Sequence, residues 1–185
     1  MSAIIDHASK MVFFMALTMP IYAVLRFVFL KMGRKSFNFC RELALLVFVV
    51  FSVGLLSQTV LPNIGRNTVG NSVHCTNLIP FKVFVDTYNQ VFKQGNLSYF
   101  LINFLGNIIL FIPFGFFIPW LWKTSGKLTV VIGFGVSLFI ELSQLFLKRG
   151  TDVDDLILNT AGVALGIVLY RASAKTIKSM TSKSD

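Results

Sequence analysis

Apolar residues along the chain gather in five long runs that are separated by polar segments. The runs cover about residues 11–30, 43–61, 99–122, 128–147 and 152–170. Each approaches the ~20 residues that an α-helix needs to cross the hydrocarbon layer of a bilayer. The pattern therefore predicts an all-α fold, a polytopic membrane helix bundle with about five transmembrane helices. We treat residues 1–185 as a single integral membrane domain.

The fifth run is short and begins with acidic residues. Its apolar part, 156–170, has fifteen residues and would form ~22 Å of helix, less than the ~30 Å hydrocarbon layer. To span the membrane, the helix must begin near Asp152. The acidic residues at 152–155 are therefore expected at the membrane surface or just beneath it, where aspartate also suits a helix N-terminus.

The longest segment between two runs, 62–98, contains an aromatic repeat. Phe81, Phe84, Tyr88 and Phe92 recur at the spacing of one helical face. An aromatic stripe of this kind beside a membrane is typical of an interfacial amphipathic helix. We expect segment 62–98 to form an outer loop that carries such a helix.

Composition supports a membrane protein. Hydrophobic residues make up 55% of the chain, and only 17 Lys or Arg and 8 Asp or Glu are present, too few to cover a soluble domain of this size. The net charge of +9 would suit nucleic acid, but the basic residues lie at the ends of the apolar runs, as membrane topology signals do. We predict no nucleic-acid partner.

The distribution of Lys and Arg predicts the orientation. Ten of them fall in segments 31–42, 123–127 and 171–185, and six fall in the segments that would face the other side. Because basic residues concentrate on the cytoplasmic side, the N-terminus is expected outside and the C-terminus in the cytoplasm.

Acidic residues and amides mark a candidate site. Four of the eight acidic residues lie between Glu141 and Asp155, and a carboxylate in or beside an apolar span is a functional-site hypothesis by default. At 1.5 Å per residue, Asn107, Glu141 and Asn159 would lie ~12, ~9 and ~10 Å from the outer ends of three different runs. This agreement predicts one polar pocket that opens to the exterior.

Helical spacing adds a second feature of the fifth run. Asp152, Asp155, Asn159, Gly162 and Gly166 follow a 3-4-3-4 spacing, which places them on one helix face. The polar end of this seam would face outward, and the glycines would let a neighbouring helix approach closely.

Three motifs carry a family resemblance. They are NLIPF at 77–81, NIILFIPFG at 107–115, and a third set formed by Glu141, Gln144, Arg149, Asp152, Asp154, Asp155, Asn159 and Gly162. In order and spacing they resemble the VanZ-like membrane proteins. The resemblance implies a small polytopic protein of the bacterial cell membrane, associated with decreased susceptibility to teicoplanin-type lipoglycopeptide antibiotics. It brings no established reaction.

The candidate residues have two kinds of interpretation. Glu141 and Asp155 are hypothetical catalytic groups, with structural hydrogen bonding as the alternative for Glu141. The candidate binding residues are Asn107, Gln144, Arg149, Asp152, Asp154 and Asn159. The three aspartates at 152, 154 and 155 either bind a divalent cation or share a proton, or they cap the helix and pair with Lys148 and Arg149. The two asparagines are also expected to form hydrogen bonds between helices.

Three functions remain open. In the first, the pocket binds a membrane lipid, a lipid-linked small molecule or the lipoglycopeptide itself, and no cofactor beyond the candidate cation is expected. In the second, the chain is a membrane enzyme that acts on a lipid or lipid-linked cell-envelope substrate through Glu141 and the aspartate cluster. In the third, the protein is structural or linked to proton movement.

Overall fold

The computed structural model describes residues 2–33, 38–59, 77–146 and 152–182. Within these ranges every named element is helical and no strand occurs. Five helices are long and apolar enough to cross a membrane: Val12–Met32, Phe39–Ser57, Leu97–Trp122, Gly126–Leu145 and Val153–Ala174. The predicted all-α bundle with five candidate spans is therefore confirmed.

The second span begins four residues earlier than the sequence pattern predicts. Its helix, α2 (Phe39–Thr59), starts ahead of the charged residues Arg41 and Glu42. The side-chain oxygen of Asn38 accepts a hydrogen bond from the backbone N–H of Arg41 at 3.0 Å. This contact caps the helix before the apolar run begins, so the two charged residues lie in the first helical turn.

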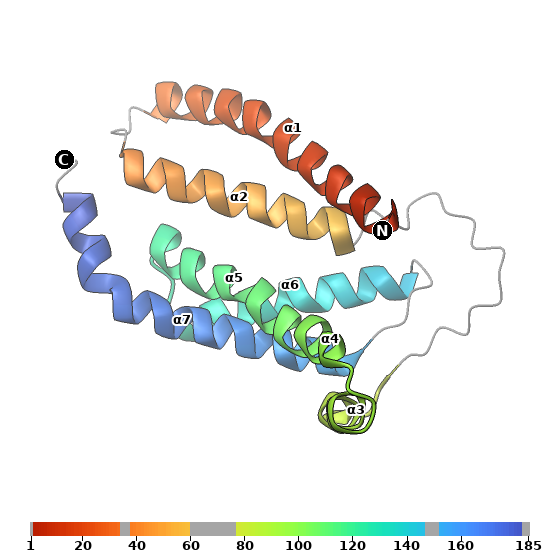
Figure 1. Ribbon diagram of the computed structural model, residues 1–185. Coiled ribbons are helices and arrows are strands. Elements are labelled where there is room, and N and C mark those ends of the chain that lie inside the picture. The colour runs from red at the N-terminus through yellow and green to blue at the C-terminus, as the bar shows by residue number, and fades with distance from the viewer. Residues whose placement is uncertain (1, 34–37, 60–76, 147–151, 183–185) are drawn as a thin grey trace. The chain divides into compact units, whose positions relative to one another are not determined.

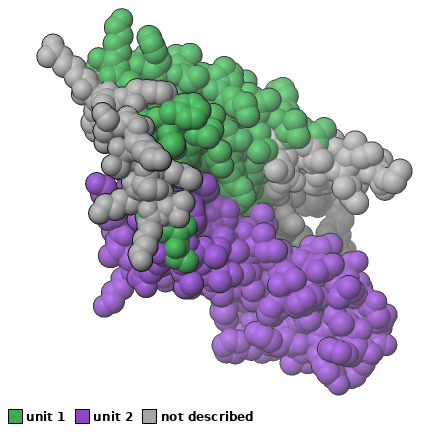
Figure 2. All heavy atoms as spheres, turned by 60° about the vertical axis from the view of Figure 1, so that its left-hand side comes forward, with its two compact units in different colours: residues 1–62, 172–185 green, residues 63–171 purple. Residues whose placement is uncertain are grey.

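The chain divides into two compact units (Figure 2). One unit comprises residues 1–62 and 172–185, and the other comprises 63–171. In the first unit, α1 (Ser2–Gly33) and α2 form a hairpin in which the two helices lie side by side (Figure 1). The pair is joined by an ion pair between Arg26 of α1 and Glu42 of α2.

The second unit contains the remaining helices. The predicted outer-loop helix is present as α3 (Lys82–Tyr88), which continues into the π-helical segment η2 (Asn89–Lys93). The third span combines α4 (Leu97–Tyr99), the π-helical segment η3 (Phe100–Leu105) and α5 (Gly106–Trp122). The last two spans are α6 (Gly126–Phe146) and the first part of α7 (Val153–Ser182). The aromatic side chains of the predicted stripe are exposed: Phe81, Phe84, Tyr88 and Phe92.

Glycines allow α5 and α7 to pack closely. A Cβ atom at Gly162 would lie less than 3.0 Å from the carbonyl oxygen of Ile108, and one at Gly166 would lie equally close to that of Ile112. Such distances leave no room for a larger residue, because a side chain would meet the backbone of α5. The prediction that the glycine end of the seam admits a neighbouring helix is confirmed, and that helix is α5.

Helix α6 joins this contact through one fully buried side chain. Val163 of α7 is 0% exposed, and its methyl groups occupy the space that a Cβ atom at Gly133 of α6 would need. Gly115 of α5 faces the carbonyl group of the same valine. Three membrane-spanning helices thus meet at Val163, one to two turns along α7 from the polar residues of the seam.

Candidate functional site

The site begins where α6 ends and α7 starts. Glu141, near the end of α6, is 5% exposed, and its Oε2 atom accepts a hydrogen bond from the backbone N–H of Asp152 at 3.1 Å. Asp152 in turn caps α7, because its Oδ1 atom accepts from the N–H of Asp154 at 2.9 Å. An aspartate at this position satisfies one of the unpaired N–H groups of the first helical turn. The predicted helix-capping role of Asp152 is confirmed.

Asn77, which lies shortly before α3 in the chain, contacts the start of α7. Its carbonyl oxygen accepts a hydrogen bond from the N–H of Val153 at 3.1 Å, and its side-chain amide donates to Asp152 Oδ1 at 2.8 Å. The two segments form an isolated parallel bridge between Asn77 and Asp152. Asn77 was not among the predicted site residues, although its place as the first residue of the NLIPF motif was a signal that could have found it.

Asp154 holds α3 in place. The side chain is 1% exposed, and its two oxygens accept hydrogen bonds from the N–H groups of Phe81 at 2.5 Å and Val83 at 2.7 Å. Phe81 precedes α3 and offers no side-chain cap of its own. Asp154 therefore caps α3 from another helix, and both carboxylate oxygens are occupied by backbone donors.

The three aspartates of the predicted cation site each have their own hydrogen-bond partners. In the parts of the chain that the structure describes, no group of three or more His, Cys, Asp or Glu side chains could hold a metal ion. The carboxylates instead have different partners: Asp152 contacts Asn77, Asp154 contacts the start of α3, and Asp155 contacts Asn107. Lys148 and Arg149, the alternative partners of the aspartates, lie outside the described residues. The binding role of Arg149 therefore stays a prediction.

Asn107 links α5 to α7. Its amide nitrogen donates hydrogen bonds to the carboxylate of Asp155 and, at 3.1 Å, to the carbonyl oxygen of Asn103 one turn earlier on its own helix. The predicted hydrogen bond between helices is confirmed. Asp155 is half-buried, so this contact leaves part of its carboxylate open to a further partner.

A second buried contact joins α6 to α7 one turn deeper. The amide nitrogen of Asn159 donates to the hydroxyl oxygen of Ser137 at 2.8 Å, and both side chains are buried. This confirms Asn159 as a partner between helices. Its Oδ1 atom is buried without a hydrogen-bond partner among the described residues. A buried acceptor of this kind normally pairs with protein, ordered water or ligand.

Gln144 occupies the edge of this set. It is half-buried about one turn beyond Glu141 on α6, and the structure gives it no hydrogen bond to another described residue. Its predicted binding role stays a prediction. Ser137 was missed as a candidate, although it lies one turn before Glu141 on the same face of α6, a spacing that the sequence shows.

The site is rich in hydrogen-bond acceptors. Backbone N–H groups and amide side chains reach all four carboxylates, those of Glu141, Asp152, Asp154 and Asp155. Ionised carboxylates only accept hydrogen bonds, and each has several lone-pair positions. The arrangement is therefore suited chemically to a group that donates hydrogen bonds, such as a hydroxyl, an amide or an amine.

Comparison with known proteins gives the family. A model of the VanZ/LLP1 family matches residues 42–175, well over half of the chain. The chain belongs to the VanZ/LLP1 family. The matched stretch contains all three motifs and all the candidate site residues described above, whereas α1 precedes it. No curated protein and no solved structure matches the chain.

Proposed function

We propose that this VanZ/LLP1 protein lowers susceptibility to teicoplanin-type lipoglycopeptides by binding an amphiphilic or lipid-linked ligand at the α5–α6–α7 site. The observation that carries the proposal is the hydrogen-bonded set in which Asn107 of α5 reaches Asp155 of α7, while Glu141 of α6 reaches Asp152 at the start of α7. Carboxylates and amides from three apolar helices are costly to bury, and a binding role accounts for them.

The proposed orientation brings this site to the cell exterior. Five helices are long and apolar enough to span, and an odd number of spans would leave the two ends of the chain on opposite sides of the membrane. The basic segments 31–42, 123–127 and 171–185 favour the cytoplasm for the C-terminus. The C-terminal end of α6 and the start of α7 then face outward, at the level where an amphiphile in the outer leaflet has its polar head.

The chemistry of the surroundings favours an amphiphile with a donor-rich head. The acceptors Glu141 and Asp155 suit the hydroxyl and amino groups of a sugar-containing head. Ile109 of α5 is 58% exposed and Phe84 of α3 is 50% exposed, so apolar surface for an acyl chain lies on the same unit. A lipoglycopeptide and a lipid-linked wall precursor share these two features.

A binding experiment tests the proposal. The purified full-length protein in detergent micelles is titrated with a fluorescently labelled teicoplanin-type lipoglycopeptide and with the same glycopeptide lacking its acyl chain, and anisotropy is measured. Preferential binding of the acylated compound, reduced at least tenfold by Asp155→Leu, is the expected result. Equal anisotropy for both compounds, or unchanged binding by Asp155→Leu, would contradict the proposal.

A membrane enzyme is the second candidate. The supporting observation is that Glu141 is buried in α6 with a backbone donor 3.1 Å away, a setting suited to a general acid or base. The substrate would be a lipid or lipid-linked cell-envelope compound, and Asp155 would be the second carboxylate. Asp154 has no part in this version, because both of its oxygens already bind the start of α3.

A further inference from the structure

The α1–α2 hairpin contains a groove that is separate from the site of the second unit. Its volume is about 520 Å³. The lining is apolar apart from Tyr22, Arg26 and Glu42, which lie partway along it, with Leu30 and Phe39 on one side and Met19 and Leu46 on the other. The apolar lining residues are Met19, Ala23, Phe27, Leu30, Phe39, Leu43 and Leu46.

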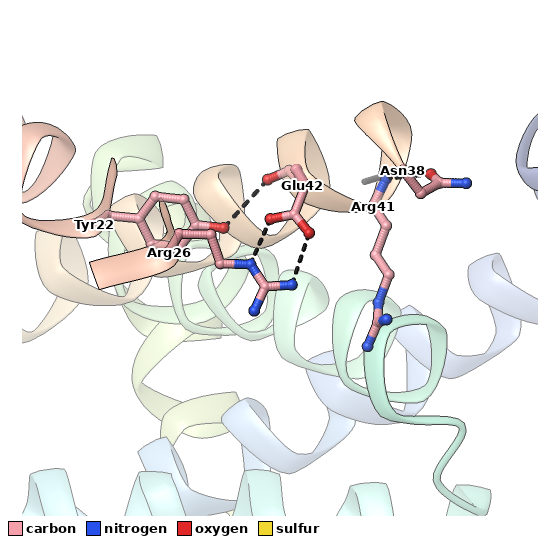
Figure 3. Close-up of polar contacts among 5 residues, drawn as sticks. All are labelled: Tyr22, Arg26, Asn38, Arg41 and Glu42. Carbon is pink, nitrogen blue, oxygen red and sulfur yellow. Dashed lines mark hydrogen bonds and ion pairs between the residues drawn. The ribbon is translucent and has the colours of Figure 1, made fainter. Parts of the chain in front are cut away.

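The polar part of the groove, formed by Tyr22, Arg26 and Glu42, is organised around the carboxylate of Glu42. Arg26 of α1 donates two hydrogen bonds to the oxygens of Glu42 on α2, at 2.6 and 2.7 Å (Figure 3). The Tyr22 hydroxyl donates to the backbone carbonyl oxygen of Glu42 at 3.4 Å. A guanidinium has five N–H groups, so three N–H groups of Arg26 have no acceptor among the described residues and can bind a further anion.

The Arg26–Glu42 pair lies within two helical turns of one end of each span, close to the level of the lipid headgroups. Glu42 is three residues after the start of the Phe39–Ser57 span, which places it ~4.5 Å inside the end of that helix. Arg26 is six residues before the end of the Val12–Met32 span, ~9 Å inside it, and its bidentate contact joins the guanidinium to the Glu42 carboxylate. From there the lining extends along α1 to Met19, seven residues or ~10 Å deeper, and that stretch is apolar except for the Tyr22 hydroxyl, which donates to the carbonyl oxygen of Glu42.

The net charge around the polar part of the groove is positive. The acidic group of Glu42 is compensated by Arg26, and Lys31 and Arg41 are two more exposed cations on the same two helices. In Figure 3 the Arg41 side chain extends away from the Arg26–Glu42 pair. The described part of the hairpin end thus has a net charge of +2, and the sequence that joins the two helices adds Arg34 and Lys35.

We propose that this groove binds an anionic phospholipid. The phosphate accepts hydrogen bonds from the remaining N–H groups of Arg26, and one acyl chain lies along the apolar lining toward Met19. Lys31 and Arg41 supply the preference for a headgroup with net negative charge over a zwitterionic one. The groove lies largely ahead of the stretch matched by the family model, which begins at Glu42.

The test uses the purified full-length protein and two lipids of identical acyl chains, phosphatidylglycerol and phosphatidylcholine. Native mass spectrometry measures the lipid bound at each concentration. Two extra positive charges near a membrane surface are expected to favour phosphatidylglycerol by about tenfold or more. Equal affinities for the two lipids would overturn the proposal, and this comparison needs no variant.

A matched pair of variants tests the position of the lipid. Ala23→Phe fills the groove and is expected to weaken phosphatidylglycerol binding at least tenfold. Ala16→Phe makes the same change at an exposed position of α1 outside the lining, and is expected to bind as the wild type does. Unchanged binding by Ala23→Phe, with circular dichroism showing the native helix content, would contradict the proposal.

Discussion

The carboxylate of Glu141 accepts a hydrogen bond from the backbone N–H of Asp152 at 3.1 Å. A buried side chain of α6 thereby fixes Asp152, the residue that directly precedes α7. The same aspartate caps α7 and binds Asn77, so the contact connects α6, α7 and the segment that precedes α3. Removal of the acceptor should loosen this junction as a whole.

Two substitutions of Glu141 separate its possible roles. Glu141→Gln keeps an oxygen that can accept from the Asp152 N–H, and we expect stability and antibiotic susceptibility close to wild type. Glu141→Leu leaves that N–H without its acceptor, which should lower the free energy of unfolding by about 1–3 kcal/mol. Unfolding in detergent and growth inhibition assays measure the two effects. Loss of resistance in a stable Glu141→Gln variant would instead favour the enzyme.

Asp154 should control the order of α3. Asp154→Asn retains only one acceptor oxygen for the N–H groups of Phe81 and Val83, so we expect these amides to exchange with deuterium at least tenfold faster. Hydrogen–deuterium exchange with mass spectrometry measures this directly. Asp86→Asn, the same substitution on α3 itself, is the control and should leave the exchange of Val83 unchanged. Equal protection in Asp154→Asn would refute the capping role.

Alanine substitutions at two glycines should change the stability of the protein in opposite directions. At Gly162 an added methyl group would collide with the carbonyl oxygen of Ile108, and Gly162→Ala should destabilise the protein by about 1–3 kcal/mol. At Gly135 of α6 a Cβ atom would meet no atom within 4 Å, and Gly135→Ala should stabilise the helix by up to about 1 kcal/mol. Thermal unfolding of the two variants compares them. A stable Gly162→Ala variant would mean that α5 and α7 are farther apart than described.

The proposed orientation can be tested with single cysteines. With Cys40 and Cys75 replaced by serine, Asn96→Cys is expected outside the cell, and Ser125→Cys, in the turn between α5 and α6, is expected in the cytoplasm. Both positions are exposed. A membrane-impermeant maleimide should label the first variant in intact cells and the second only after permeabilisation. The reverse labelling would place the carboxylate site on the cytoplasmic side.

Sequence spacing could predict the contacts within the bundle. The positions of Asn107, Asp155 and Asn159 follow from helical periodicity and from the distance to the end of each apolar run, and the contacts that join α5 and α6 to α7 confirm the convergence. The glycines of α7 follow from the same periodicity. These contacts lie between long regular helices, for which residue spacing determines the face and depth of each side chain.

Contacts that depend on residues 77–83 could not be predicted in this way. Asp154 binds backbone groups 73 and 71 residues earlier in the chain, and these N–H groups belong to an irregular segment whose path periodicity does not define. The hydrogen bonds of Asn77 have the same origin. For this reason the sequence left a cation site and helix capping open for these aspartates, whose carboxylates bind Asn77, the start of α3 and Asn107 in the structure.

The most direct measurement is the susceptibility of bacteria that express one of two matched variants to a teicoplanin-type lipoglycopeptide. Asn107→Leu removes the contact with Asp155, whereas Asn103→Leu, one turn away on the same helical path, removes only a side-chain bond to the carbonyl oxygen of Tyr99. At equal expression, we predict that Asn107→Leu abolishes the protection given by the wild type and that Asn103→Leu retains it. Full protection by Asn107→Leu would contradict the proposed role of the α5–α6–α7 site.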